Sequence, residues 1–414
     1  MRLTATSRPT LRDRYLDIGF YLVCATFAGL SAIWSEFFGY RVWGALSLVG
    51  YLFGLGQAVA GLVRPDATGR WASRRIPIWL TAVTGFVAPL VVLLITRLHG
   101  VLWSEQPEVW VVERSTTLLF HHGTPYTDLA ALGRPPIVDD YTPYGPVMTV
   151  FGLPRALLGA ASPLGDARIA FAVGAVVVVA VALRVAGRPV VPVRALQLVV
   201  AGPLTVLTAT TAGDDIAVVA LVMLALALLH ARRPVACAAV ITIAVSMKLT
   251  AVVALVVLAV AVLAMLGRRA LVRFLATAVG VGAVLNVPVL LVDPTSFVEH
   301  VIRFPIGLGR AHSPAASPLP GNLIARLGPV GHDVSLALLL AGGVAMAVWL
   351  LRRPPRTTAD AALRIAVGLA GAIMLAPATR WGYLVYPVVL VGAAITLRSA
   401  RTAPVAEAEP APVN

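Results

Sequence analysis

The sequence predicts an all-α polytopic membrane protein with 12 or 13 transmembrane helices. Of its 414 residues, 59% are hydrophobic and only 13% are charged, whereas soluble domains carry about 25% charged residues. Uncharged, mostly apolar runs of the length that crosses a bilayer recur along the chain. This composition excludes a soluble globular enzyme, a disordered protein and a nucleic-acid-binding domain.

The predicted spans follow one another with few long connections. The first begins near Ile18 and has no small-residue cleavage site, so we expect a retained helix rather than a signal peptide. Residues 234–267 form either two short helices broken near Ser246 or one long kinked helix. The spans are expected at residues 18–35, 42–63, 77–98, 143–162, 167–186, 195–213, 214–230, 234–248, 249–267, 272–292, 334–351, 361–378 and 381–398.

These spans divide the chain into four regions. We expect an added N-terminal helix pair at 1–76, a core at 77–330 and C-terminal transmembrane helices at 331–398. The Ala-, Pro- and Glu-rich segment 399–414 has no periodicity and is predicted to be a disordered tail. The two cysteines, Cys24 and Cys237, lie inside apolar runs and indicate no disulfide framework.

The net charge of +14 does not indicate a nucleic-acid partner, because most arginines cluster in short connections, where they orient helices. The positive-inside rule places four of these connections in the cytoplasm, at 64–75, 232–233, 268–269 and 352–353. The loops 100–142 and 292–333 then lie outside a plasma membrane. Arg188 and Arg194 conflict with this scheme, which leaves either a re-entrant helix or arginines that bind lipid phosphate.

The first outside loop concentrates carboxylates and aromatic rings. It holds six of the 19 acidic residues, which are Glu105, Glu108, Glu113, Asp128, Asp139 and Asp140, together with Trp103, Trp110, Tyr126 and Tyr141. Carboxylates accept hydrogen bonds from hydroxyl groups and rings stack on sugars, so the loop suits a carbohydrate. The alternative is a solvated acidic surface loop.

An amphipathic helix on the membrane surface is expected at 108–122, ending at Gly123. Glu108 and Glu113 are five residues apart, so on one helix they diverge by about 140°. His121 and His122 point to opposite sides and find no third ligand at a suitable spacing, so we expect no metal site and no cofactor.

Ionisable residues also occur where apolar spans begin or end. Asp214 and Asp215 open a span, where the helix dipole favours carboxylates, or they line a polar cavity. Lys248 is the only lysine and lies between two apolar runs. A cation there snorkels, pairs with an aspartate or binds an anion such as phosphate.

The second outside loop is basic and rich in glycine and proline. It contains Arg303, Arg310 and His312, followed by Asn322. These cations oppose the usual charge bias of outside loops, and a lipid phosphate would account for them. The alternative is an ordinary basic loop.

These features together resemble the polyprenol-phosphate-mannose-dependent alpha-mannosyltransferases, glycosyltransferase family 87, of the C-type membrane glycosyltransferase fold. The resemblance covers roughly residues 77–330. Its motif positions here are Glu108, Val112, Ser115, Leu118, Leu119, Gly123, Pro125 and Tyr126, then the sequence from Tyr141 to Pro146, Gly213 with Asp214, and Lys248 to Ala251. The family carboxylate is usually aspartate, and Val112 replaces its usual tyrosine.

The resemblance implies an inverting transfer of a hexose, expected to be mannose, from a polyprenyl-phosphate donor to a lipid or glycan acceptor of the cell envelope. Glu108, with Glu113 as the alternative, is the implied general base. The donor phosphate is expected to contact Lys248, Arg303, Arg310 and His312. Cavity-lining residues are expected to be Asp214, Asp215, Tyr126, Tyr144 and Asn322.

Two other classes also fit a polytopic chain. A transporter or lipid flippase would have broken helices and intramembrane charges, but its usual internal repeat is not visible. A non-catalytic membrane scaffold would not explain a single lysine between apolar runs.

Overall fold

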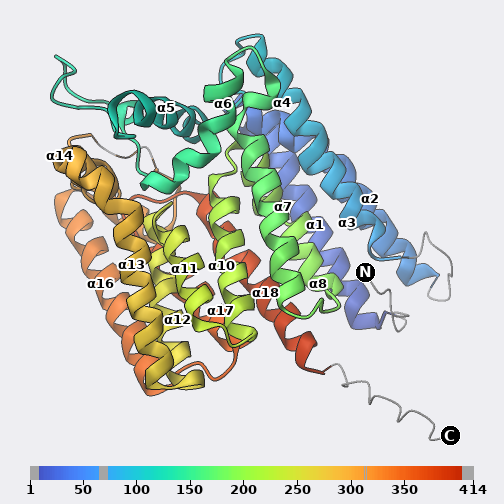
Figure 1. The fold of residues 1–414 in the computed structure, drawn as a ribbon. Helices are drawn as coiled ribbons and strands as arrows, with labels where there is room; N and C mark the ends of the chain where they lie inside the picture. Colours follow the sequence, from blue (N-terminus) through green and yellow to red (C-terminus); the bar gives the residue numbers. More distant parts are fainter. Residues whose placement is uncertain (1–8, 65–72, 312, 314, 403–414) are drawn as a thin grey trace, which may run out of the picture.

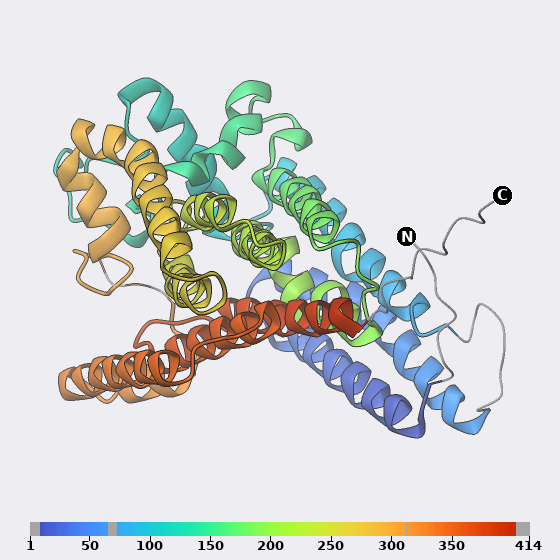
Figure 2. The same ribbon diagram turned by 60° about the horizontal axis from the view of Figure 1, so that its bottom comes forward.

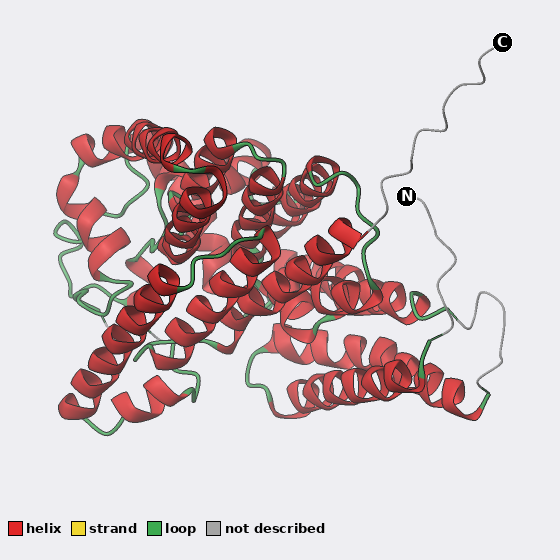
Figure 3. Cartoon of the chain, turned by 90° about the horizontal axis from the view of Figure 1, so that it is seen from below, coloured by secondary structure: helices red, strands yellow, loops and turns green. Residues whose placement is uncertain are grey.

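The computed structural model describes residues 9–64, 73–311, 313 and 315–402. Within these residues the chain consists of helices and loops, without a strand (Figure 3). Ten of the described helices are long and apolar enough to cross a membrane. The chain is therefore a multi-pass membrane protein, which confirms the predicted all-α class.

The described helices follow the apolar runs closely. The first half of the chain contains α1 (Leu11–Trp34), α2 (Phe38–Val63), α3 (Ile76–Ala82), α4 (Ala88–Leu98), α5 (Pro107–His122), α6 (Leu153–Leu158), α7 (Ala167–Val185), α8 (Val193–Leu196) and α9 (Pro203–Thr211). The second half contains α10 (Asp214–His230), α11 (Pro234–Val245), α12 (Val252–Leu266), α13 (Arg268–Val292), α14 (Pro294–Phe297), α15 (Pro320–Ala325), α16 (Pro329–Arg352), α17 (Thr358–Leu375) and α18 (Val385–Thr402).

Shorter turns complete several of these elements. The π-helical turns are Val83–Val87, which joins α3 to α4, Gln197–Ala201, which joins α8 to α9, and Val298–Arg303, which follows α14. The 3-10 turns are Val138–Asp140, Pro146–Gly152, Pro163–Gly165, Leu249–Ala251 and Trp381–Leu384.

The two ends of the helix bundle differ in character (Figure 1). We call the end that carries α5, α6, α14 and the long loops the loop end. The opposite end carries the short arginine-containing connections after α7, α10, α12 and α16, and we call it the arginine end. The predicted surface helix is confirmed as α5, which lies across the loop end and stops at Gly123 with a left-handed φ of 71°.

The predicted span at 143–162 does not cross the bundle. Its residues form a 3-10 turn and the six-residue α6, and they stay at the loop end beside α5 (Figure 1). Gly152 packs so closely that an added Cβ would lie 2.2 Å from the hydroxyl of Thr116 on α5. Prolines at the start of both turns interrupt regular helix formation.

This short element resolves the topological conflict at Arg188 and Arg194. Because only α7 crosses between the first loop and these arginines, both belong to the arginine end with the other short connections. Arg194 donates to Asp17 of α1 at 2.7 Å, and Arg74 donates to the same carboxylate at 2.6 Å. The pairing ties α8 to α1 and to the segment just before α3.

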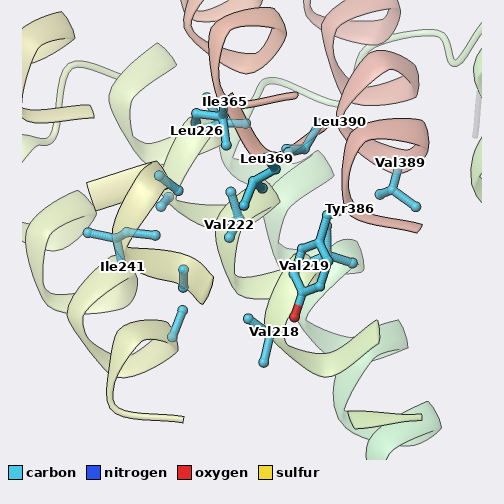
Figure 4. Close-up of a cluster of buried hydrophobic side chains, with 14 of the residues drawn as sticks. Val218, Val219, Val222, Leu226, Ile241, Ile365, Leu369, Tyr386, Val389 and Leu390 are labelled. Carbon is cyan, nitrogen blue, oxygen red and sulfur yellow. The ribbon is translucent and has the colours of Figure 1, made fainter. Parts of the chain in front are cut away.

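The core lies around α10, which is apolar on all sides and therefore buried. It contacts α7, α11, α12, α17 and α18. Figure 4 shows Val222 and Leu226 of α10 facing Ile365 and Leu369 of α17. Figure 2 shows α16, α17 and α18 running together along one side of the bundle.

Residues 234–267 form two helices rather than one kinked helix. Ser246 accepts a hydrogen bond from Asn286 of α13 at 2.8 Å, and Thr242 packs on Gly282, so α11 runs parallel to α13. Since α13 returns alongside α12 after Gly267, α11 and α12 form an antiparallel hairpin. Lys248 lies at its bend, inside the bundle.

The observed helices refine two further predictions. Three predicted spans, 143–162, 214–230 and 234–248, form helices shorter than 18 residues, so ten full-length spans remain of the 12 or 13 expected. α18 continues to Thr402, four residues into the segment expected as a tail, and 403–414 lie outside the described residues.

Candidate functional site

A cavity of about 480 Å³ opens among α5, the α11–α12 bend, α17 and the start of α18. Its charged lining residues are Glu108, Asp139, Lys248 and Arg380. Its tyrosines are Tyr141, Tyr144, Tyr383 and Tyr386. Aliphatic side chains of α12, α16 and α17 form the remaining wall, so a polar head and an apolar wall share one space.

The ammonium of Lys248 is the central cation of this cavity. It lies 2.8 Å from Asp214 Oδ2 and 2.5 Å from Asp215 Oδ1. Both carboxylates begin α10, where helix N–H groups favour negative charge. The preceding Gly213 has a left-handed φ of 96° that permits this sharp start. Of the roles considered for Lys248, pairing with aspartate is the one present in this structure.

Aromatic rings surround the same ammonium. Lys248 Nζ lies 5.5 Å from the ring centre of Tyr144 and 5.1 Å from that of Tyr383. The hydroxyl of Tyr386 donates to Asp215 Oδ1 at 2.7 Å. Ring faces attract a cation, so Lys248 is held by two carboxylates and two rings while its side chain remains 11% exposed.

Glu108 faces this cavity from the first turn of α5. One carboxylate oxygen, Oε1, accepts a hydrogen bond from Arg380, and the other, Oε2, is buried without a hydrogen-bond partner in the described structure. Arg380 also donates to the side chain of Gln106 at 3.3 Å. Burial acts to lower the pKa of Arg380, but Glu108 beside it raises the pKa overall. A buried carboxylate oxygen without a partner keeps its capacity to accept a hydrogen bond.

Gly145 sets the distance between the first loop and the hairpin bend. Its N–H donates to the carbonyl of Met247 at 2.9 Å, and an added Cβ would lie 2.2 Å from the carbonyl oxygen of Ser246. Only glycine lets the two backbones approach this closely. The contact places Tyr144 beside Lys248.

The two loops of the loop end pack against each other through buried polar contacts. The Tyr141 hydroxyl donates to Glu299 at 3.0 Å, and the Thr142 N–H donates to His300 Nδ1 at 2.9 Å. His300 Nε2 in turn lies 3.0 Å from the carbonyl of Thr127. Burial lowers the pKa of His300 to about 4, so the ring is neutral at pH 7 and can accept the Thr142 hydrogen bond.

Glu113, the second carboxylate considered as a base, lies outside this cavity. It forms a bidentate pair with Arg97 at 2.9 and 2.7 Å and accepts from the backbone N–H of Ala167 at 3.0 Å. Arg97 also pairs with Asp166 at 2.6 Å. Five residues of helix turn Glu113 away from Glu108, and the carboxylate joins α5 to α4 and α7.

The described basic residues of the second loop do not line the cavity. Arg303 is 56% exposed and pairs with Glu299 of its own helix turn at 3.4 Å. Arg310 is exposed, and its backbone N–H donates to the Tyr141 hydroxyl at 2.9 Å. His312 lies outside the described residues. The cavity wall from this loop is formed instead by Phe304 and its neighbours.

The remaining predicted residues lie at different depths. Tyr144 lines the cavity, and Asp214 and Asp215 lie directly behind Lys248. Tyr126 is buried behind the wall, where its hydroxyl donates to the carbonyl of Tyr144 at 3.1 Å. Asn322 is also behind the wall and donates to the carbonyl of Pro377 at 2.7 Å.

Sequence reasoning missed Arg380 and the tyrosines that follow it. Arg380 lies between the predicted spans 361–378 and 381–398, and Tyr383 and Tyr386 lie within the second of them. One signal was present, because Arg380 is the single charge between Arg364 and Arg398 and stands beside Trp381 and two tyrosines. In the fold, the Thr379 N–H donates to the carbonyl of Ala315 at 2.8 Å, which anchors this segment to the second loop.

Metal binding was also considered for these side chains. Among the residues that the structure describes, no group of three or more histidine, cysteine, aspartate or glutamate side chains is arranged to hold a metal ion.

Comparison with known proteins identifies the family. No curated protein sequence matches the chain. Two solved structures of ArnT from Cupriavidus metallidurans, one bound to undecaprenyl phosphate and one in the apo state, are 19% and 20% identical to it, with TM-scores of 0.44 and 0.46. Each comparison covers 76% of this chain, which spans 59% and 58% of those chains. The model of glycosyltransferase family 87 matches residues 141–377, more than half of the sequence, and the chain therefore belongs to glycosyltransferase family 87.

Proposed function

We propose that this protein transfers a hexose, expected to be mannose, from a polyprenyl-phosphate donor to a lipid or glycan acceptor of the cell envelope. The observation that carries the proposal is one cavity lined by two cations and by a carboxylate, one oxygen of which has no hydrogen-bond partner among the described residues. Glu108 supplies the carboxylate, and Lys248 and Arg380 supply the cations. Membership of glycosyltransferase family 87 supports glycosyl transfer as the chemistry of this cavity.

In the proposed reaction, the acceptor hydroxyl loses its proton to Glu108 Oε2 as its oxygen bonds to the anomeric carbon. General-base assistance of this kind contributes about 10²- to 10⁴-fold to rate. The bond from the anomeric carbon to the phosphate oxygen breaks on the opposite face, and its electron pair leaves with the lipid phosphate. The configuration at the anomeric carbon is therefore inverted. The two cavity cations stabilise the departing phosphate.

The shape of the cavity supports a lipid donor. Its apolar wall includes Val252 and Val253 of α12, Leu339 of α16 and Ile373 of α17. A polyprenyl chain is hydrocarbon and binds such a wall without loss of hydrogen bonds. The phosphate and sugar would then occupy the polar part between α5 and the hairpin bend.

The active site is proposed to face the extracytoplasmic side of the plasma membrane. The cavity lies at the loop end, whereas the short arginine-containing connections lie at the other end. Short loops rich in arginine remain in the cytoplasm. The variant Arg134→Cys, which places a cysteine in an exposed loop of the loop end, tests this orientation. A membrane-impermeant thiol reagent added to intact cells should label this cysteine.

The direct test uses the purified protein in lipid nanodiscs with radiolabelled polyprenyl-phosphate mannose and an envelope lipid extract. Wild type should transfer label to a lipid or glycan fraction. Glu108→Gln should lower turnover by about 10²-fold or more, because the amide cannot take the proton. Glu113→Gln is the matched carboxylate control on the same helix. Absence of label transfer by wild type from any polyprenyl-phosphate hexose would refute the proposal.

A further inference from the structure

Among the described residues, every cation that lines the cavity already has a carboxylate partner. Lys248 is paired with Asp214 and Asp215, and Arg380 is paired with Glu108. An incoming phosphate therefore meets no unpaired cation on the described wall. It can bind tightly only if one of these cations is shared with it or changes partner.

Arg380 is the cation better suited to sharing. Lys248 is held by two carboxylates and its side chain is 11% exposed, whereas Arg380 has one carboxylate and is 26% exposed. Both hydrogen bonds of Arg380, to Glu108 and to Gln106, leave from Nη1. A guanidinium presents five N–H donors in a planar fork, so the Nε and Nη2 edge is available to phosphate oxygens.

We propose that Arg380 is a shared cation that pairs with Glu108 in the empty cavity and moves to the phosphate when the donor lipid binds. This inference rests on the function proposed above and adds a residue and an order of events to it. While Arg380 contacts Glu108, one oxygen of the carboxylate is held by the guanidinium. Donor binding draws the guanidinium away, so both carboxylate oxygens become free for the acceptor only when a donor is present.

The charges in the reaction support this role. The acceptor proton neutralises Glu108 as the carbon–oxygen bond to the phosphate breaks and the phosphate gains a negative charge. Negative charge thus moves from the base to the leaving group. Arg380, already drawn to the phosphate, is then in place to stabilise the charge that arrives there.

Binding of a polyprenyl phosphate, compared with the matching polyprenol, tests the proposal without a sugar or an acceptor. Affinities of the full-length protein in detergent are measured by native mass spectrometry. Arg380→Gln should weaken phosphate-dependent binding by about 10-fold or more, as expected for a charge-assisted hydrogen bond. Glu108→Gln should strengthen it by about 3-fold or more, because the competing carboxylate is removed. The double variant should bind as weakly as Arg380→Gln.

Arg326→Gln is the matched control. Among the described residues, the side chain of this exposed arginine of the second loop donates to a backbone carbonyl and does not line the cavity. Its affinity should equal that of wild type. The gain expected for Glu108→Gln cannot result from misfolding, so it separates a shared cation from a merely structural ion pair.

The outcomes distinguish the two proposals. If the wild-type protein binds the polyprenyl phosphate no better than the polyprenol, the donor class in the proposed function is refuted. If it prefers the phosphate but Glu108→Gln binds equally or more weakly, or Arg380→Gln binds equally, the shared cation is refuted while the proposed function stands.

Discussion

Replacing Lys248 by methionine should destabilise the folded protein as well as weaken donor binding. The ammonium is within 2.8 Å of both Asp214 and Asp215. These two residues are only 1% and 4% exposed. Methionine fills similar space but leaves two adjacent buried carboxylates without their cation. Removing one partner of a buried ion pair costs about 3–5 kcal/mol, so the free energy of unfolding should fall by that amount.

The assay is thermal unfolding in detergent, followed by tryptophan fluorescence, for wild type, Lys248→Met and the double variant Lys248→Met with Asp214→Asn. The double variant restores one net negative charge to the cluster, as in wild type when both carboxylates are ionised. It should therefore recover part of the lost melting temperature. Asp214→Asn alone is the matched control, because it keeps the pair of Lys248 with Asp215.

Two results would overturn this reasoning. A Lys248→Met protein that melts with wild type would show that the carboxylates do not depend on the ammonium. A double variant that melts below Lys248→Met would show that repulsion between the aspartates is not the source of the loss. Donor binding is measured separately, with the polyprenyl phosphate, on samples that remain folded.

Three other positions separate packing from chemistry. Gly145→Ala should abolish transfer and lower the melting temperature, because its methyl group would meet the Ser246 carbonyl, whereas Gly371→Ala, with open space around it, should melt at or above wild type. His300 has an ordinary pKa of 6.5 and a folded pKa of about 4, so the unfolded chain binds more protons between these values. Stability should therefore be full above pH 6.5 and fall as the pH drops toward 4, and His300→Gln should flatten that part of the melting profile. Glu113→Gln should lower the melting temperature, but the folded fraction of this variant should turn over far faster than Glu108→Gln. A transfer assay normalised to the amount of folded protein checks this expectation.

Although it left open whether residues 234–267 break near Lys248 or form one kinked helix, the sequence alone determined the membrane class and the surface helix. Each depends on neighbours within a few residues. Apolar runs of sufficient length form helices in a bilayer because their backbone groups must be satisfied within the segment. Gly123 ends α5 through its own backbone conformation. The divergence of Glu108 and Glu113 follows from the helical repeat.

Only the tertiary structure decided which charges meet. Arg380 pairs with Glu108 across 272 residues, and Lys248 with Asp214 across 34. No local pattern encodes such distances, because many arginines of this chain could have met that carboxylate with equal chemistry. Contact with α5 likewise decided that residues 143–162 stay at the loop end and do not cross the bundle. Only α7 therefore crosses before Arg188, which places Arg188 at the arginine end. Hydrophobicity fixes which segments enter the membrane, but close packing between distant segments fixes which polar groups share a buried cavity.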